Sequence, residues 1–309
     1  MPSLIARLLH RFVTLGLMIG PFAAPAEAQT PADHLWGAIN GQDVAALRAA
    51  VAEGADVNAP NNEGRVPLYR ALVLQRQPLV EALLELGADA NAKDHRGDPL
   101  LIIAMSVGSA DGALALIRAG ADANARDTIG KSALYYAINM QQPDIVAALI
   151  KAGVDVNAPS DPTDAGDPTQ PLFLAIKSGQ LGIAQQVIAA GADVNARDAK
   201  GSVPLHRAVL ARPDDVMLGL VAALLDAGAD ANAMRPKGGA PLHNLVFGAG
   251  DLRPETLIQV TTLFAQHKAN LNLPAEFDGA TPLDVAKAKG NQAAIDALAS
   301  LGAQCKLNC

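Results

Sequence analysis

The chain has 309 residues, of which 50% are hydrophobic, only 3% are aromatic and 18% are charged. This composition argues against general disorder, and the formal net charge of −7 argues against nucleic-acid binding, which usually needs a basic surface. Only two cysteines are present, both among the last five residues, so the fold is not built on disulfides.

Residues 1–28 have the pattern of a secretory signal peptide. Two arginines are followed by a short apolar stretch and by Ala26-Glu27-Ala28, which is an A-x-A cleavage motif. The apolar stretch is shorter than the ~20 residues that span a bilayer. We therefore expect cleavage after Ala28, a short linker over 29–32, and a mature protein in the periplasm or outside the cell, without stable membrane insertion. An uncleaved N-terminal anchor is the alternative.

A short motif recurs through the rest of the chain. It reads Gly-Ala-Asp-x-Asn in most copies, and the copies begin at residues 54, 87, 120, 153, 191, 228, 268 and 302, with the last two degenerate or truncated. A second motif, Pro-Leu or Ala-Leu, runs in step at residues 67, 99, 133, 171, 204, 241 and 282. The copies of the first motif are 33 to 40 residues apart, and such a period indicates stacked supersecondary units.

The residues of one unit predict its local structure. Proline suits the first turn of a helix, where its missing N–H is not needed. Residues 144–150 have apolar side chains at the i, i+3 and i+4 spacing of a second helix, and Gly153 is suited to end that helix. Each unit therefore reads as helix, loop, helix and extended turn. One such pair cannot bury its apolar face alone, so neighbouring units must stack.

This pattern resembles the ankyrin-repeat family over nearly all of residues 33–304. The resemblance implies an all-α solenoid of about eight helix-loop-helix units joined by extended, β-hairpin-like turns, in one domain that precedes a Cys-containing tail over 305–309. Thr281-Pro282-Leu283 keeps the family's full Thr-Pro-Leu start, whereas Asp284 replaces the usual His. We place the units near 33–62, 63–95, 96–128, 129–166, 167–199, 200–237, 238–277 and 278–304, with the first and last as caps.

Three units are longer than the period, with extra residues around 158–170, 212–219 and 248–254. Insertions in solenoids map to loops and often to the binding face, although drift in a tolerant loop is the alternative. The first insertion contains three aspartates whose spacing fits no known calcium loop, so we expect no metal site there. These aspartates are Asp161, Asp164 and Asp167.

No catalytic arrangement stands out. His206 and His243 occupy the position where a His of this family hydrogen-bonds within its repeat, so we expect a structural role for both. Gly130-Lys131-Ser132 lacks the glycine that a phosphate loop has five places earlier. Without convergent titratable groups we expect neither an enzyme nor a cofactor.

The resemblance places the binding surface on a concave face, which the ends of the inner helices and the turn tips line. The inner-helix candidates, mostly apolar, are Val73, Leu74, Met105, Asn139, Met140, Leu210 and Phe247. They predict one contact stripe, and the alternative is that some of them pack against the adjacent helix. The basic candidates at the turn tips are Arg65, Arg96, Lys131, Lys200 and Lys237. They would steer an acidic protein partner, or serve only as solvated surface.

Cys305 and Cys309 form a C-x3-C pair that an oxidising compartment would close into a disulfide, with an intermolecular bridge as the rival. Together these observations predict a monomeric, non-catalytic protein-protein interaction module of the bacterial envelope that acts as an adaptor or accessory protein. The bacterial source is suggested by the style of the signal peptide and the alanine-rich composition. The alternatives are an inhibitor or immunity protein that blocks a secreted hydrolase or toxin, a membrane-anchored scaffold, and an enzyme.

Overall fold

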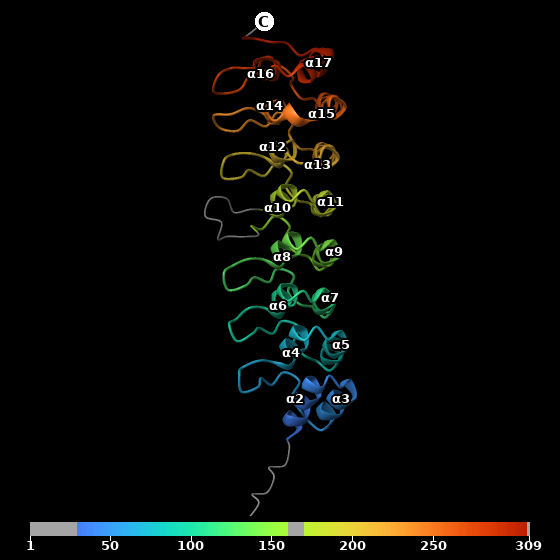
Figure 1. Cartoon of the computed structure of the whole chain (residues 1–309). Helices are drawn as coiled ribbons and strands as arrows, with labels where there is room; N and C mark the ends of the chain where they lie inside the picture. The colour runs from blue at the N-terminus through green and yellow to red at the C-terminus, as the bar shows by residue number, and fades with distance from the viewer. Residues whose placement is uncertain (1–29, 160–169, 308–309) are drawn as a thin grey trace, which may run out of the picture. The chain divides into compact units, whose positions relative to one another are not determined.

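The computed structural model describes residues 30–159 and 170–307, and the helices lie in two compact units (Figure 1). The predicted signal peptide, the three aspartates of the first insertion and Cys309 lie outside the described residues. The first unit ends at Asp56 and contains α2 (Pro31–Gly41) and α3 (Val44–Ala52), which pack on each other. Thr30 and Asp33 cap α2 reciprocally, and the side chain of Asp43 accepts hydrogen bonds from the first backbone N–H groups of α3.

The second unit begins at Val57 and consists of helix pairs. In chain order its helices are α4 (Pro67–Val73), α5 (Gln77–Glu85), α6 (Leu100–Ser106), α7 (Ala110–Arg118), α8 (Ala133–Asn139), α9 (Pro143–Lys151), α10 (Pro171–Lys177), α11 (Leu181–Ala189), α12 (Pro204–Ala208), α13 (Asp214–Asp226), α14 (Pro241–Phe247), α15 (Pro254–Gln266), α16 (Pro282–Lys289) and α17 (Gln292–Ser300). A short 3-10 helix, η1 (Ala249–Asp251), follows α14.

The helices of the second unit form two rows. The first helix of each pair contacts the first helix of the next pair, from α4 to α16, and the second helices do the same from α5 to α17. We call these rows inner and outer, because the extended turns protrude on the side of the first row (Figure 1). Leucines at the repeated positions, such as Leu68 and Leu134, are buried between the rows. This arrangement confirms the predicted helical solenoid.

The repeated Gly-Ala-Asp-x-Asn motif connects each helix pair to the next helix pair. From here on we call one such repeat a unit. The Oδ1 atom of Asn91 accepts a hydrogen bond from the backbone N–H of Asp122, at 2.7 Å, and its Nδ2 atom donates to the carbonyl of Gly120. The carboxylate of Asp122 in turn accepts from the backbone N–H of Asn124. Corresponding bonds recur from Asn58 to Asn232, so an asparagine ladder runs along the array. The motif therefore supplies hydrogen bonds between successive repeats along this part of the chain.

Several of the extended turns are each held by one polar side chain. In the turn after α5, Asp94 accepts hydrogen bonds from the backbone N–H groups of Arg96 and Asp98. An isolated antiparallel bridge joins Lys93 to Pro99 at the base of this turn. Asp127 and Asp198 make the same pair of bonds in their own turns. The turns at 93–99 and 126–132, each of which contains such a bridge, are therefore β-hairpin-like, as the family resemblance implied.

None of the described helices combines the length and the apolarity that crossing a bilayer requires. The described residues also contain no group of three or more His, Cys, Asp or Glu side chains that could hold a metal ion.

Candidate partner-binding site

His206 and His243 connect neighbouring units. The Nδ1 atom of His243 accepts from the backbone N–H of Ala240, at 3.1 Å, and its Nε2 atom donates to the carbonyl of Ala280 in the next unit. His206 makes the equivalent bonds one unit earlier. Burial lowers the pKa of both rings, which keeps them neutral at pH 7. Both nitrogens of each ring are used in the fold, so the structural role expected for these residues is confirmed.

Asp284 occupies the histidine position in the last unit and makes different hydrogen bonds. Its carboxylate accepts from the backbone N–H and the hydroxyl of Thr281, and from the backbone N–H groups of Lys306 and Leu307. Here the residues that follow the last helix offer donors, whereas the next unit offers a carbonyl to His243. An acceptor therefore replaces the histidine where the array ends.

The inner-helix candidates differ in their exposure. Val73, Asn139, Met140, Leu210 and Phe247 are exposed, and Leu74 is half-buried. The expectation for Met105 is wrong, because only 2% of this residue is exposed and it belongs to the core.

The reason lies in the register of one proline. Pro99 is the N-cap of α6, with ψ at 139°, whereas Pro67 is the first residue of α4. The helical positions of this unit are therefore shifted by one residue, and Met105 takes the core position that Leu72 fills in the preceding unit. Ser106 and Val107 are the residues of this unit that correspond to Val73 and Leu74.

The exposed apolar residues do not form one continuous stripe. The side chain of Leu210 packs against the backbone at the end of α14. The Cδ2 atom of Leu210 would lie only 2.9 Å from a Cβ atom placed on Gly248. Between this end of the array and Met140, the equivalent positions of α10 are Lys177 and Ser178, which are polar and exposed. The apolar surface is thus divided into a part near α4 to α8 and a part near α12 to α16.

The basic turn residues fall into two groups. Arg65 pairs with Glu63 at 2.9 Å and lies over the ring of Tyr69, and Lys131 lies 4.8 Å from the ring centre of Tyr135. These two side chains are held within their own units. The other three candidates, Arg96, Lys200 and Lys237, are exposed.

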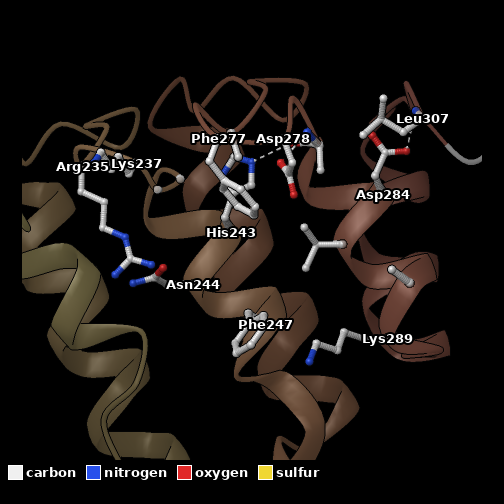
Figure 2. A pocket seen from close by; sticks show the side chains of 16 residues that line it. Arg235, Lys237, His243, Asn244, Phe247, Phe277, Asp278, Asp284, Lys289 and Leu307 are labelled. Atoms are coloured by element: carbon white, nitrogen blue, oxygen red, sulfur yellow. Dashed lines mark hydrogen bonds between the residues drawn. The ribbon is translucent and has the colours of Figure 1, made fainter.

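A cavity of about 420 Å³ lies between the inner helices α14 and α16 (Figure 2). Its walls include Asn244 and Phe247 of α14 and Val285, Ala288 and Lys289 of α16. The turns before these helices close it with residues from 235–239 and 275–280, and Leu307 adds a wall from the end of the chain. Figure 2 shows Phe247 and Lys289 pointing toward one another, with Phe277 and Asp278 above them and Arg235 extended beside Asn244. We call this cavity the α14–α16 pocket.

Exposed apolar groups surround the α14–α16 pocket. Phe247 is 66% exposed, Phe277 is 72% exposed and Leu307 is 50% exposed, and all three line the pocket. The ammonium of Lys289 lies 4.0 Å from the ring centre of Phe247. Large exposed apolar side chains gathered around one hollow are typical of binding sites rather than of ordinary surface.

Two of the predicted residues, Lys237 and Phe247, meet at this pocket. Sequence reasoning missed Phe277, Lys289 and Leu307. One signal was available for Phe277, because it is the only aromatic residue in a turn among the described parts of the chain. The Sγ atom of Cys305 lies 3.3 Å from the ammonium of Lys287. Cys309 falls outside the described residues, so the pairing of the two cysteines stays a prediction.

The comparisons with known proteins agree with this geometry. Residues 91–160 match a family model described as ankyrin repeats in three copies, and residues 170–199 match one described as an ankyrin repeat. The fold is similar to the crystal structure of the ankyrin repeat domain of Bcl-3, described as a unique member of the IkappaB protein family. The TM-score is 0.54 at 27% identity, over 68% of this chain and 92% of that chain.

No curated protein matches the sequence. Ankyrin repeats typically form non-catalytic scaffolds for protein-protein interaction, and this chain has the paired helices, hairpin turns and histidine connectors of such a scaffold. The matched segments and the fold are those of ankyrin repeats, and ankyrin repeats indicate a protein-protein interaction module.

Proposed function

We propose that this protein binds a protein partner in the bacterial envelope through its inner-helix face, as a non-catalytic adaptor or accessory protein. The observation that carries the proposal is the α14–α16 pocket, where Phe247, Phe277 and Leu307 are all at least half exposed. Aromatic side chains in such hollows commonly dominate the binding energy of protein interfaces. The location in the envelope is supported by the signal-peptide pattern of residues 1–28.

The chemistry of the pocket supports binding without catalysis. His243 uses both ring nitrogens in hydrogen bonds to the backbone, and the carboxylate of Asp284 accepts from four groups. Asp278 is the remaining acidic group of the lining, and its Oδ1 atom accepts from the backbone N–H of Ala280. Acid-base catalysis needs a positioned group that is free to exchange a proton with a substrate. The lining offers no acid-base pair of this kind.

Site-specific photo-crosslinking in the native envelope tests the proposal. A photoreactive amino acid replaces Met140 or Phe247 on the inner-helix ends, or Ile258 on α15 of the outer row, which is similarly exposed. We expect one discrete protein adduct from the two inner positions and none from Ile258. Equal adducts from Ile258, or no adduct from either inner position, would contradict the proposal. A hydrolase or toxin as the captured protein would identify the role as that of an inhibitor.

A further inference from the structure

We propose that the α14–α16 pocket selects a partner segment in which one large apolar side chain is flanked by carboxylate groups. This inference rests on the proposed function and adds the chemistry of the partner. It combines two observations at the same place, which are an apolar hollow with exposed rings and a set of cations around it.

The apolar part of the pocket determines the size of the inserted group. A volume of about 420 Å³ lies near the lower end of the ~300–1,000 Å³ typical of small-ligand pockets, so it accommodates one or two side chains rather than a folded surface. Phe247 and Phe277 present their rings to this space from α14 and from the next turn. Covering these rings with another apolar side chain removes exposed apolar area from water.

The charges around the pocket determine what flanks the inserted group. Arg235, Lys237 and Lys289 line it, and none of the three side chains forms an ion pair with a carboxylate of the described residues. The whole chain has a net charge of −7, so a cluster of three cations is unusual on this acidic protein. Unpaired cations at the edge of an apolar site favour acidic partners, through both attraction and faster association.

The acidic residues nearby offset this cluster only in part. Asp284 is buried and keeps its negative charge, which four hydrogen-bond donors stabilise. Asp278 is the one exposed carboxylate of the lining. Glu276 lies outside the lining and accepts from the backbone N–H of Lys237. The lining therefore contains three cations and two carboxylates, and Asp278 is the exposed one of the two carboxylates.

A protein segment fits these observations better than a membrane surface. Insertion into a bilayer requires aromatic side chains that project outward from the protein. Here the ring of Phe247 lies on the wall of a hollow and beneath the ammonium of Lys289. A hollow of this kind receives a side chain from its partner, as anchor residues do at the centres of interfaces.

The test uses the full chain and labelled nine-residue peptides in fluorescence anisotropy titrations. The first peptide has a central Phe with Asp and Glu on both sides. In the second peptide Asn and Gln replace the acidic residues, and in the third Ala replaces the central Phe. We expect saturable binding of the first peptide that weakens several-fold as salt is raised from about 0.05 to 0.5 M, because exposed charges are screened. The other two peptides should bind at least about tenfold more weakly.

Matched variants locate the site. Phe277→Ala should weaken binding of the first peptide by about tenfold, and Lys289→Gln by about threefold with a smaller salt dependence. Ile129→Ala, an exposed apolar residue in another turn, and Lys151→Gln, an exposed lysine on α9, are the controls and should have no effect. Thermal unfolding curves establish that all four variants remain folded.

Several results would overturn the inference. No binding of the first peptide at millimolar concentration, equal binding of all three peptides, or equal effects of the pocket and control variants would each do so. Binding to anionic lipid vesicles that Phe277→Ala abolishes, in the absence of peptide binding, would show that the pocket serves a membrane. The proposed function is tested separately, because inner-face crosslinks to a protein partner that persist in Phe277→Ala would leave it standing while this inference fails.

Discussion

Asp284 should hold the last residues of the chain on the final unit, and its replacement should release them. Only 2% of Asp284 is exposed, and its oxygens lie 2.9 to 3.1 Å from donors of Thr281, Lys306 and Leu307. Asp284→Ala removes the acceptor of three backbone N–H groups. The N–H groups of Lys306 and Leu307 can then bind water once these residues are released. The N–H of Thr281 stays buried without its acceptor, which costs about 1–3 kcal/mol, and the charged hydrogen bonds are lost in addition.

We therefore expect Asp284→Ala to destabilise the last unit by about 3 kcal/mol, and Asp284→Asn by about half as much because one oxygen acceptor remains. The pH dependence follows from the same contacts. Burial raises the pKa of Asp284, but the hydrogen bonds from Thr281, Leu307 and Lys306 lower it by more. The pKa of Asp284 is therefore well below its ordinary value of 3.8. A lowered pKa in the folded state stabilises the protein above the pKa of the unfolded state. This stabilisation should be lost as the pH falls below about 4, and Asp284→Asn should not show that loss.

Hydrogen exchange and urea unfolding measure these effects. The amides of Lys306 and Leu307 should exchange faster in both variants, and the urea midpoint should fall. Asp296→Asn, an exposed aspartate on α17 that binds only Gln292 among the described residues, is the matched control. If both Asp284 variants unfold within about 0.5 kcal/mol of the parent and the two amides exchange unchanged, the reasoning is wrong, because such small effects are those of ordinary surface changes.

Four further predictions follow from other parts of the chain. Burial lowers the pKa of His243 below its ordinary value of 6.5, so stability should fall as the pH drops below about 6.5, and urea titrations at pH 7 and 5 should show that His243→Gln reduces this loss, while His206 retains its own share of it. Asn195→Ala removes hydrogen bonds to the next unit at an exposed edge and should cost about 1 kcal/mol in thermal unfolding, whereas an unchanged midpoint would show that the ladder contributes nothing. N-terminal sequencing of the exported protein should begin at Gln29, and an intact N-terminus on cytosolic protein would refute cleavage. Non-reducing mass spectrometry should find Cys305 and Cys309 paired within one chain, against which a disulfide-linked dimer would count.

The helices could be predicted from sequence because their signals are local. Gly153 adopts φ of 84° two residues after the end of α9, a conformation in which glycine commonly ends helices, and the proline motif marks the start of most inner helices. The error at Met105 arose because proline is tolerated both at the N-cap and at the first helical position. Gly108, whose φ is 76°, indicated the correct register, since it follows Pro99 by nine residues, whereas Gln75, with φ of 51°, follows Pro67 by eight.

The α14–α16 pocket could not be predicted in the same way. Arg235, Phe277 and Leu307 come from two turns and from the end of the chain, and they meet only because the last two units stack. None of them occupies a repeated motif position, so periodicity contains no information about their meeting. A repeated pattern predicts what the units share, whereas the binding residues are those in which one unit differs from the rest.

The connectors between units set the length to which this array can grow by duplication. Each histidine donates forward to a carbonyl of the following unit, and each ladder asparagine accepts from an N–H of the following unit. A unit copied into the middle of the array would therefore find suitable partners on both sides. A unit added after residue 304 would instead meet Asp284, which has no N–H to offer the incoming carbonyl. Stacking a further unit on α16 and α17 would require an N–H donor at this position, as in Asp284→His, together with release of Lys306 and Leu307 from Asp284.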